Sequence, residues 1–280
     1  MTIALSVLVS DGMVMATDSA TTLIDSGTVL NVFNSANKLF NLHKGLPIGG
    51  YTYGAGAIGD ASISTLAKDF RMELTLGSAI GPSGWRFDPA TYTIEEVAVA
   101  VRQFMYEERY LPLYGAADPK PSLGFNVGGY SAHAALPELW AVFIDATGAC
   151  ARPSRLKAPG EYGIAWAGEM EAIYRLLFGY GTGMGDALAG IGLPAAAVPA
   201  ALTALQSKLE IALSTPAMPI QDTIDLADYL VDLTIKYSRF KAGAPTVGGP
   251  VEIAAITKHE GFKWVRRKHY YDAAYNPRGA

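Results

Sequence analysis

Residues 1–19, MTIALSVLVSDGMVMATDS, contain two apolar runs separated by Asp11-Gly12. Asp-Gly between two β-rich runs is a strong hairpin signal, because both residues tolerate the positive φ of a type I′ turn. The first run, Ile3–Val9, has the length of a signal-peptide core, but no Lys or Arg precedes it and no small-residue cleavage site follows it. We therefore expect the chain to begin inside an antiparallel sheet and not with an export signal.

The rest of the chain continues in blocks of strands and blocks of helices. The predicted strands are Ile3–Val9, Met13–Asp18, Lys38–Leu42, Ile48–Ile58, Leu123–Tyr130, Glu138–Ile144, Pro250–Thr257 and Phe262–Val265. The predicted helices are Ala61–Leu76, a segment starting with the capping box of Thr93 and Glu96, Gly168–Phe178, an Ala-rich region at about Asp186–Ser214, and Thr223–Tyr237. This order is not the strand-helix alternation of a doubly wound parallel sheet. It predicts an α+β fold with two antiparallel sheets stacked face to face and helices outside.

We interpret residues 1–280 as a single domain, because no linker and no internal repeat stands out. An Ala-rich helical insertion is expected at about residues 183–218, and a basic C-terminal tail at about 262–280. The four cations of that tail surround Trp264, and we expect a solvated tail or a subunit contact; they are Lys263, Arg266, Arg267 and Lys268.

Composition excludes several classes of function. A net charge of −4 supplies no field for gathering nucleic acid. The longest apolar stretch, Ala187–Leu202, is short and broken by Pro194 and Pro199, so no membrane span is expected. The single cysteine, Cys150, rules out an internal disulfide, and the four histidines lack ligand spacing, so we expect no metal and no cofactor. The cytoplasm is the expected compartment.

Chemistry is suggested at the second residue. Thr2 is small enough for the initiator methionine to be removed, which would leave a hydroxyl beside a free α-amine. That pair is a nucleophile with its own base, because the hydroxyl attacks a carbonyl while the amine takes the proton. An α-amine titrates near about pH 7.7–8.0. A nearby cation would enlarge its free-base fraction.

Three segments carry a resemblance to a known family. The opening T-x8-D-G-x-V-x-A-T-D-S, then ANKLFNL at Ala36–Leu42, then YGAGAIGDAS at Tyr53–Ser62, resemble the proteasome β-subunit family of N-terminal-nucleophile hydrolases. The similarity is dense to about residue 75 and continues, more weakly, over most of the chain. The TVGGP segment and the length resemble the bacterial proteasome homologues of the betaproteobacterial or Anbu type. The resemblance implies a four-layer αββα sandwich, the N-terminal-nucleophile hydrolase fold.

The resemblance also implies site residues by position. Thr2 matches the nucleophile, Asp18 its acidic partner, and Lys38 the lysine beside the nucleophile. Gly56 matches the glycine whose N–H serves the oxyanion. The residues implied to line the pocket for the residue before the cut are Thr21, Ala36, Gly54 and Ile58.

Two departures from the family pattern leave the threonine amine without its usual bracing residues. The family's Gly-Ser-Gly appears here as Ala167-Gly168-Glu169, and the late Asp…Ser pair is absent from KAGAPTVGGP. Glu169 and Thr246 are candidates for replacing them. The spacing between Asp18 and Lys38 is also longer than usual by about four residues, which we expect a loop to absorb.

A strict Asp11-Gly12 hairpin would pair Thr2 with Thr21 and turn Asp18 to the other face. Thr2 and Asp18 can therefore converge only where strand pairing ends or bulges near Asp18.

Three functions remain open from the sequence. The first is a self-compartmentalising threonine peptidase that closes into a homo-oligomeric ring or double ring and degrades peptides and proteins. The second is a small-molecule amidase or acylase of the same superfamily, and the third is a ring subunit without catalysis. The sequence does not specify ring size or an unfoldase partner.

Overall fold

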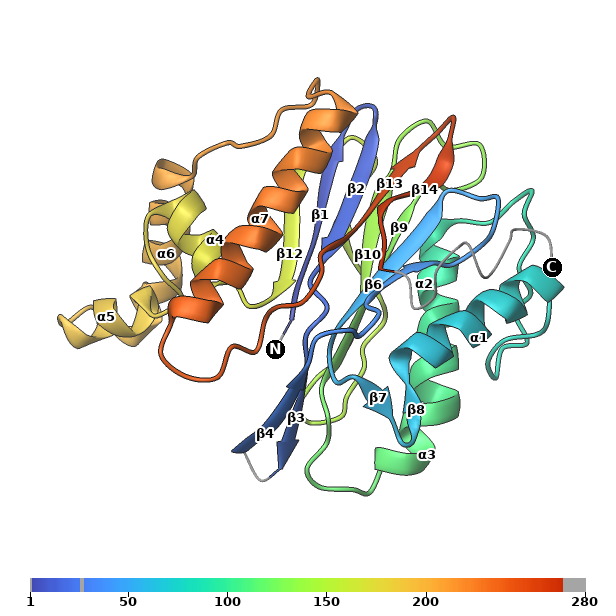
Figure 1. The fold of residues 1–280 in the computed structure, drawn as a ribbon, viewed down its shortest axis with the longest axis horizontal. Coiled ribbons are helices and arrows are strands. Elements are labelled where there is room, and N and C mark those ends of the chain that lie inside the picture. The colour runs from blue at the N-terminus through green and yellow to red at the C-terminus, as the bar shows by residue number, and fades with distance from the viewer. Residues whose placement is uncertain (1, 26–27, 269–280) are drawn as a thin grey trace.

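The computed structural model describes residues 2–25 and 28–268, and their backbone forms four layers (Figure 1). Two five-stranded antiparallel sheets stack face to face, and helices cover the outer face of each. The predicted α+β sandwich of αββα type is confirmed. Residue 1 and residues 269–280, which include most of the predicted basic tail, lie outside the described residues.

The first sheet has the strand order β12-β1-β2-β13-β14. Its strands are β1 (Ile3–Val9), β2 (Gly12–Thr17), β12 (Gly163–Gly168), β13 (Glu252–Thr257) and β14 (Gly261–Arg266). Every residue of β1 and β2 is buried, because these strands lie between the second sheet and a layer of helices.

The hairpin of β1 and β2 differs by one residue from the predicted one. Val9 pairs with Gly12, so Ser10 and Asp11 form the loop, and neither has a positive φ. Gly12 instead lies in the strand, where a Cβ would come within 2.6 Å of the Ile256 carbonyl oxygen. The close approach of β13, and not a type I′ turn, therefore requires the glycine.

The second sheet has the order β11-β10-β9-β6-β5. Its strands are β5 (Leu39–Asn41), β6 (Ile48–Gly54), β9 (Leu123–Gly129), β10 (Glu138–Ile144) and β11 (Ser154–Lys157). Side chains from the two inner sheet faces form a central core that includes Leu8, Met15 and Leu139. This core fixes the distance between the sheets.

Helices on the second sheet are α1 (Ile63–Leu76), α2 (Ile94–Arg102), η1 (Gln103–Tyr110) and α3 (Leu111–Tyr114). The predicted capping box is confirmed: Thr93 Oγ1 accepts from Glu96 N at 3.1 Å, and the Glu96 carboxylate accepts from Thr93 N at 2.9 Å. Val97, Val101 and Phe104 of this helical run are buried against the sheet, as their helical spacing predicts.

Helices on the first sheet are α4 (Glu171–Phe178) and α7 (Ile220–Phe240), and both pack in a second outer core with β1 and β2. The Ala-rich region contains α5 (Met184–Gly190), the short helix η2 (Ala195–Ala197) and α6 (Val198–Leu209). Figure 1 shows α5 projecting from the body at the outer edge of this layer. No helix among the described residues has the length and hydropathy needed to cross a bilayer.

Several short strands were not predicted. The stretch expected to be a loop is a hairpin, β3 (Thr21–Asp25) with β4 (Thr28–Phe33), which extends away from the sheets (Figure 1). A second small hairpin, β7 (Ala57–Ile58) with β8 (Ala61–Ser62), precedes α1. Strands β11 and β12 were also missed. Both are edge strands with partly exposed side chains, so they lack a strong apolar pattern.

Candidate active site

Thr2 is held at the start of β1 by its own backbone. Its carbonyl oxygen accepts from Glu169 N at 2.7 Å, just beyond the end of β12. Gly168 makes this approach possible: its φ is +91°, and a Cβ there would lie 1.8 Å from the Thr2 carbonyl oxygen. Only glycine tolerates both conditions. The Thr2 side chain is buried, and its position is fixed from the β12 side.

Asp18 follows β2 at the point where strand pairing ends. The last β1–β2 pair is Ala4 with Thr17, and one further backbone hydrogen bond, from Asp18 N to Ile3 O at 3.1 Å, closes the ladder. The Asp18 carboxylate is fully buried and accepts three backbone N–H groups: Ile3 at 3.1 Å, Ala20 at 3.1 Å and Gly248 at 3.0 Å. The end of pairing near Asp18 is the condition under which the sequence allowed Thr2 and Asp18 to converge.

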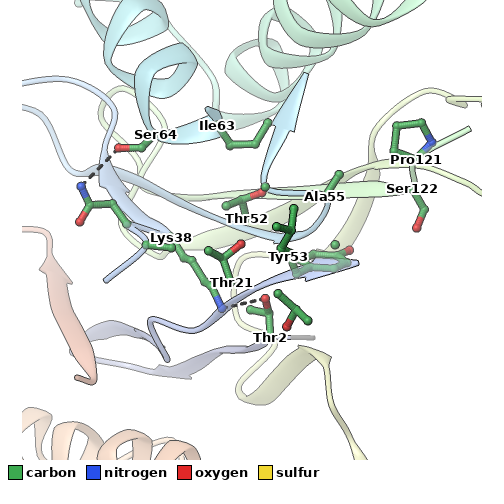
Figure 2. Close-up of a pocket in the computed structure, with 16 residues that line it drawn as sticks. Thr2, Thr21, Lys38, Thr52, Tyr53, Ala55, Ile63, Ser64, Pro121 and Ser122 are labelled. Carbon is green, nitrogen blue, oxygen red and sulfur yellow. Dashed lines mark hydrogen bonds between the residues drawn. The ribbon is translucent and has the colours of Figure 1, made fainter. Parts of the chain in front are cut away.

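Lys38 joins these two residues. It precedes β5, and its ammonium Nζ donates to Thr2 Oγ1 at 2.8 Å and to Asp18 Oδ1 at 2.6 Å. Figure 2 shows the Lys38 side chain reaching across to Thr2. The side chain is only 6% exposed, and this burial lowers the pKa of the Lys38 ammonium, although the Asp18 carboxylate opposes the shift. A cation in this position stabilises negative charge developing on the threonine oxygen.

A cavity of about 610 Å³ opens beside Thr2 and Lys38. Its described lining carries hydroxyl, amide and apolar groups, and Lys38 is the only charged residue among them. Burial raises the pKa of Tyr53 to about 12, so that phenol is also neutral. The lining consists of Thr2, Thr21, Thr22, Leu23, Ala36, Asn37, Lys38, Thr52, Tyr53, Gly54, Ala55, Gly56, Ile63, Ser64, Pro121 and Ser122. The volume is of the size that takes a small molecule or a peptide side chain.

Three of the four residues expected around the substrate line this cavity: Thr21, Ala36 and Gly54. The structure does not bring Ile58 to it. Ile58 is 4% exposed and packs in the core beneath α1, because the small β7–β8 hairpin turns its side chain inward. Tyr53 also lines the cavity, although it was not predicted to do so, and its ring lies over Gly124, where a Cβ would come within 2.0 Å of the ring.

Gly56 lines the cavity directly before β7. Its carbonyl oxygen accepts from Ile63 N at 3.0 Å, and none of the hydrogen bonds in the described part of the chain uses its N–H. A Cβ at this position would lie 3.0 Å from Thr21 Oγ1, which narrows the space beside the amide. Glycine therefore keeps this amide unobstructed.

The two residues considered as replacements for the family's bracing groups behave differently. Glu169 contacts Thr2 through its backbone N–H, while its carboxylate accepts from Glu171 N at 3.4 Å. Thr246 Oγ1 is buried without a hydrogen-bond partner among the described residues. Gly248, two residues later, was not singled out from the sequence, yet its N–H binds Asp18. Backbone donors leave no side-chain signal in a sequence.

No cluster of three or more His, Cys, Asp or Glu side chains suited to a metal occurs among residues 2–25 and 28–268. The geometry that the described residues do present is a hydroxyl, an ammonium and a carboxylate in contact, at the wall of a cavity whose described lining is uncharged apart from Lys38.

Comparisons with known proteins identify the fold. No protein-family model matches the chain, and no curated protein matches it. Among solved structures, the Gly-1 mutant of Anbu from Hyphomicrobium sp. strain MC1 aligns with 96% of this chain and 86% of its own, at 15% identity and a TM-score of 0.54. Anbu (ancestral beta-subunit) from Yersinia bercovieri aligns with 96% of this chain and 89% of its own, at 13% identity and a TM-score of 0.48. The first likeness shows that the two chains share the sandwich fold.

Proposed function

We propose that this chain is a threonine hydrolase of the N-terminal-nucleophile type that cleaves peptide amide bonds. One observation carries the proposal: the buried Lys38 ammonium contacts both Thr2 Oγ1, at 2.8 Å, and the Asp18 carboxylate, at 2.6 Å, beside a cavity of about 610 Å³. Burying a charge costs free energy, and buried ionised groups are therefore often functional. Here the buried Lys38 ammonium contacts the Thr2 hydroxyl.

The proposed reaction begins once removal of Met1 makes the Thr2 nitrogen a primary amine. Thr2 Oγ1 attacks the carbonyl carbon of the scissile amide, and its proton passes to the α-amine. The amine then returns this proton to the leaving nitrogen as the C–N bond breaks, which leaves an acyl ester on Thr2. Water, deprotonated by the same amine, cleaves the ester and regenerates the hydroxyl.

Two further groups take part in this proposal. Lys38 stabilises the threonine oxygen as it loses its proton, and the Asp18 carboxylate holds the lysine in place. The Gly56 N–H is proposed to donate to the oxyanion of the tetrahedral intermediate. The proximity of Gly56 to the cavity and its unused N–H support that role.

We further propose that the enzyme is a self-compartmentalising endopeptidase. An active hydroxyl that needs no partner for activation would attack exposed polypeptides unless it is enclosed, and closure of identical subunits into a ring provides the enclosure. Apart from Lys38, the described lining of the cavity is uncharged, which favours substrates with a neutral residue before the cleaved bond.

Intact-mass spectrometry with a peptide epoxyketone, which reacts with both the hydroxyl and the amine of a terminal threonine, tests the proposal. We expect loss of Met1 and addition of one inhibitor mass to wild type, no adduct on T2A, and hydrolysis of fluorogenic peptides that T2A does not support. The variant T2S keeps a hydroxyl and should retain activity. Retention of Met1 with no adduct would overturn the proposal.

Two companion measurements separate the alternatives. Turnover of small acyl amides without turnover of peptides would identify an amidase instead of a peptidase. A stable monomer in native mass spectrometry would refute self-compartmentalisation.

A further inference from the structure

Lys268, which follows β14, does not extend into solvent with the rest of the basic cluster. Its side chain is 9% exposed, and its ammonium lies within hydrogen-bond distance of three oxygens. These are Ser19 Oγ at 2.7 Å, the Ala36 carbonyl at 2.7 Å and Glu252 Oε2 at 2.8 Å. The contacts with Ser19 Oγ and the Ala36 carbonyl are hydrogen bonds, and the contact with Glu252 Oε2 is an ion pair.

The partners of Lys268 belong to the segments that carry the candidate catalytic residues. Ser19 follows Asp18 directly, and Ala36 lies two residues before Lys38. The two segments also contact each other, because Ala36 N donates to Ser19 O at 2.9 Å. Lys268 therefore links the segment that contains Asp18 to the segment that contains Lys38.

The third partner connects this junction to β13. Glu252 is 1% exposed and pairs in the sheet with Thr17, the residue before Asp18. Ser19 Oγ additionally donates to the Pro250 carbonyl at 2.6 Å. Both links fix the end of β2, where Asp18 leaves the ladder, against the segment that supplies the Gly248 N–H.

Burial distinguishes this ion pair from the surface pairs of the chain. Lys268 and Glu252 are 9% and 1% exposed, whereas Lys236 and Asp232, at i and i+4 on α7, are 68% and 44% exposed. Exposed pairs contribute little to stability or geometry, while breaking a buried pair leaves an uncompensated charge.

The charges around the two lysines form one connected cluster. Lys38 faces Asp18 and Lys268. Lys268 in turn faces Glu252, Asp18 and Arg267. On the far side of Glu252, Lys68 and Arg71 of α1 line a small cavity together with Arg267 and Glu252.

We propose that Lys268 is a positioning residue of the active site, which holds the Asp18 and Lys38 segments in register through Ser19 and Ala36, and that Glu252 balances its charge. This inference rests on the function proposed above. It makes a residue that follows β14 part of the support of the proposed nucleophile, Thr2.

The cluster has an electrostatic consequence for Lys38. Lys268 contributes to lowering the pKa of the Lys38 ammonium, behind the larger effect of burial and against the effect of Asp18. Loss of this cation makes protonation of Lys38 easier, and the same holds for the amine of a processed Thr2. Glu252 helps to keep Lys268 protonated, because burial lowers the pKa of the Lys268 ammonium and the Glu252 carboxylate opposes that shift.

The test compares K268M, E252Q and the double variant K268M/E252Q in the full chain. We expect K268M to lower kcat/KM by up to about 100-fold, the scale of a misplaced catalytic group. The acid limb of its pH profile should move to higher pH. E252Q makes Lys268 easier to deprotonate and should move the limb in the same direction by a smaller amount, and the double variant should resemble K268M.

Controls separate this role from a loss of folding. K236M makes the same side-chain change in the exposed pair and should leave kcat/KM and the profile unchanged. Thermal unfolding checks that the variants fold; E252Q keeps the Ser19 and Ala36 contacts and tests the charge effect even where K268M does not fold. A crystal structure of K268M should show the Lys38 Nζ to Thr2 Oγ1 contact lengthened.

The outcomes are decisive in both directions. Wild-type kcat/KM in K268M, or an acid limb of K268M that stays at its wild-type position, would overturn the inference. Wild-type protein without epoxyketone reactivity would instead refute the proposed function, and the Lys38 to Thr2 contact in the K268M structure would still test the positioning role.

Discussion

The substitution D18N should be strongly destabilising, because the four hydrogen bonds that Asp18 accepts are divided evenly between its two oxygens. Oδ1 accepts from Lys38 Nζ and Ile3 N, and Oδ2 accepts from Ala20 N and Gly248 N. An amide nitrogen replaces one oxygen in either rotamer and therefore faces two donors. The buried Lys38 also loses its counter-charge.

Breaking a buried ion pair by removing one partner costs about 3–5 kcal/mol. At about 2–4 °C per kcal/mol, this predicts a fall in Tm of about 6–20 °C. Thermal unfolding followed by circular dichroism measures it, with D232N in the exposed pair of α7 as the matched control, expected within about 0.5 kcal/mol of wild type.

A comparison with K38M makes the reasoning refutable. Removal of Lys38 leaves the Asp18 carboxylate with its three backbone donors, so K38M should lose less stability than D18N. A Tm for D18N within 2 °C of wild type, or a larger loss in K38M than in D18N, would contradict the assigned network.

Three further predictions use glycines and one carboxylate. G168A should displace Thr2, since the added Cβ would lie 1.8 Å from the Thr2 carbonyl oxygen, and we expect this variant to lose epoxyketone labelling. The control G77A, also at positive φ but with nothing within 4 Å of the added Cβ, should keep the labelling. G56A places a Cβ 3.0 Å from Thr21 Oγ1 and should lower kcat/KM about tenfold, with recovery in the double variant G56A/T21A; no recovery would place the effect elsewhere. Hydrogen bonds from Thr182, together with Arg175, lower the pKa of Glu171 from 4.5 to about 2. Between pH 4.5 and pH 2 the unfolded chain therefore binds more protons at Glu171 than the folded chain does, so the contribution of Glu171 to the free energy of unfolding is present above pH 4.5 and is lost as the pH falls toward 2. The Tm measured from pH 5 to pH 2 should fall less steeply in E171Q than in wild type.

Locally encoded features were predicted well from the sequence. The bounds of β1 follow from a continuous buried run that ends before Ser10-Asp11, and the capping box at Thr93 depends on hydrogen bonds within four residues; a sequence displays both directly. The predicted position of the first turn was wrong by one residue. Gly12 is required by the close approach of β13, which lies some 240 residues away in the chain, and not by the turn. Long-range packing of this kind leaves no local pattern.

Some residues of the candidate site could likewise be predicted from the sequence and others could not. Thr2 was singled out for its chemistry, and Asp18 and Lys38 through the family resemblance of their segments. The structure brings the three into contact, although their catalytic roles stay predictions. The Gly248 and Glu169 N–H groups were invisible because any residue supplies a backbone donor. Lys268 was misinterpreted because a cation in a basic cluster resembles a surface residue until the fold buries it.

The anchoring of Thr2 has a consequence for maturation. Among the described residues, Thr2 is held by the contact of its carbonyl oxygen with Glu169 N and by the contact of its side chain with Lys38. Neither contact uses the Thr2 nitrogen, so under the proposed function removal of residue 1 would leave both in place. Cleavage by an aminopeptidase would then change only the Thr2 nitrogen, from an amide that does not accept a proton to an amine that does.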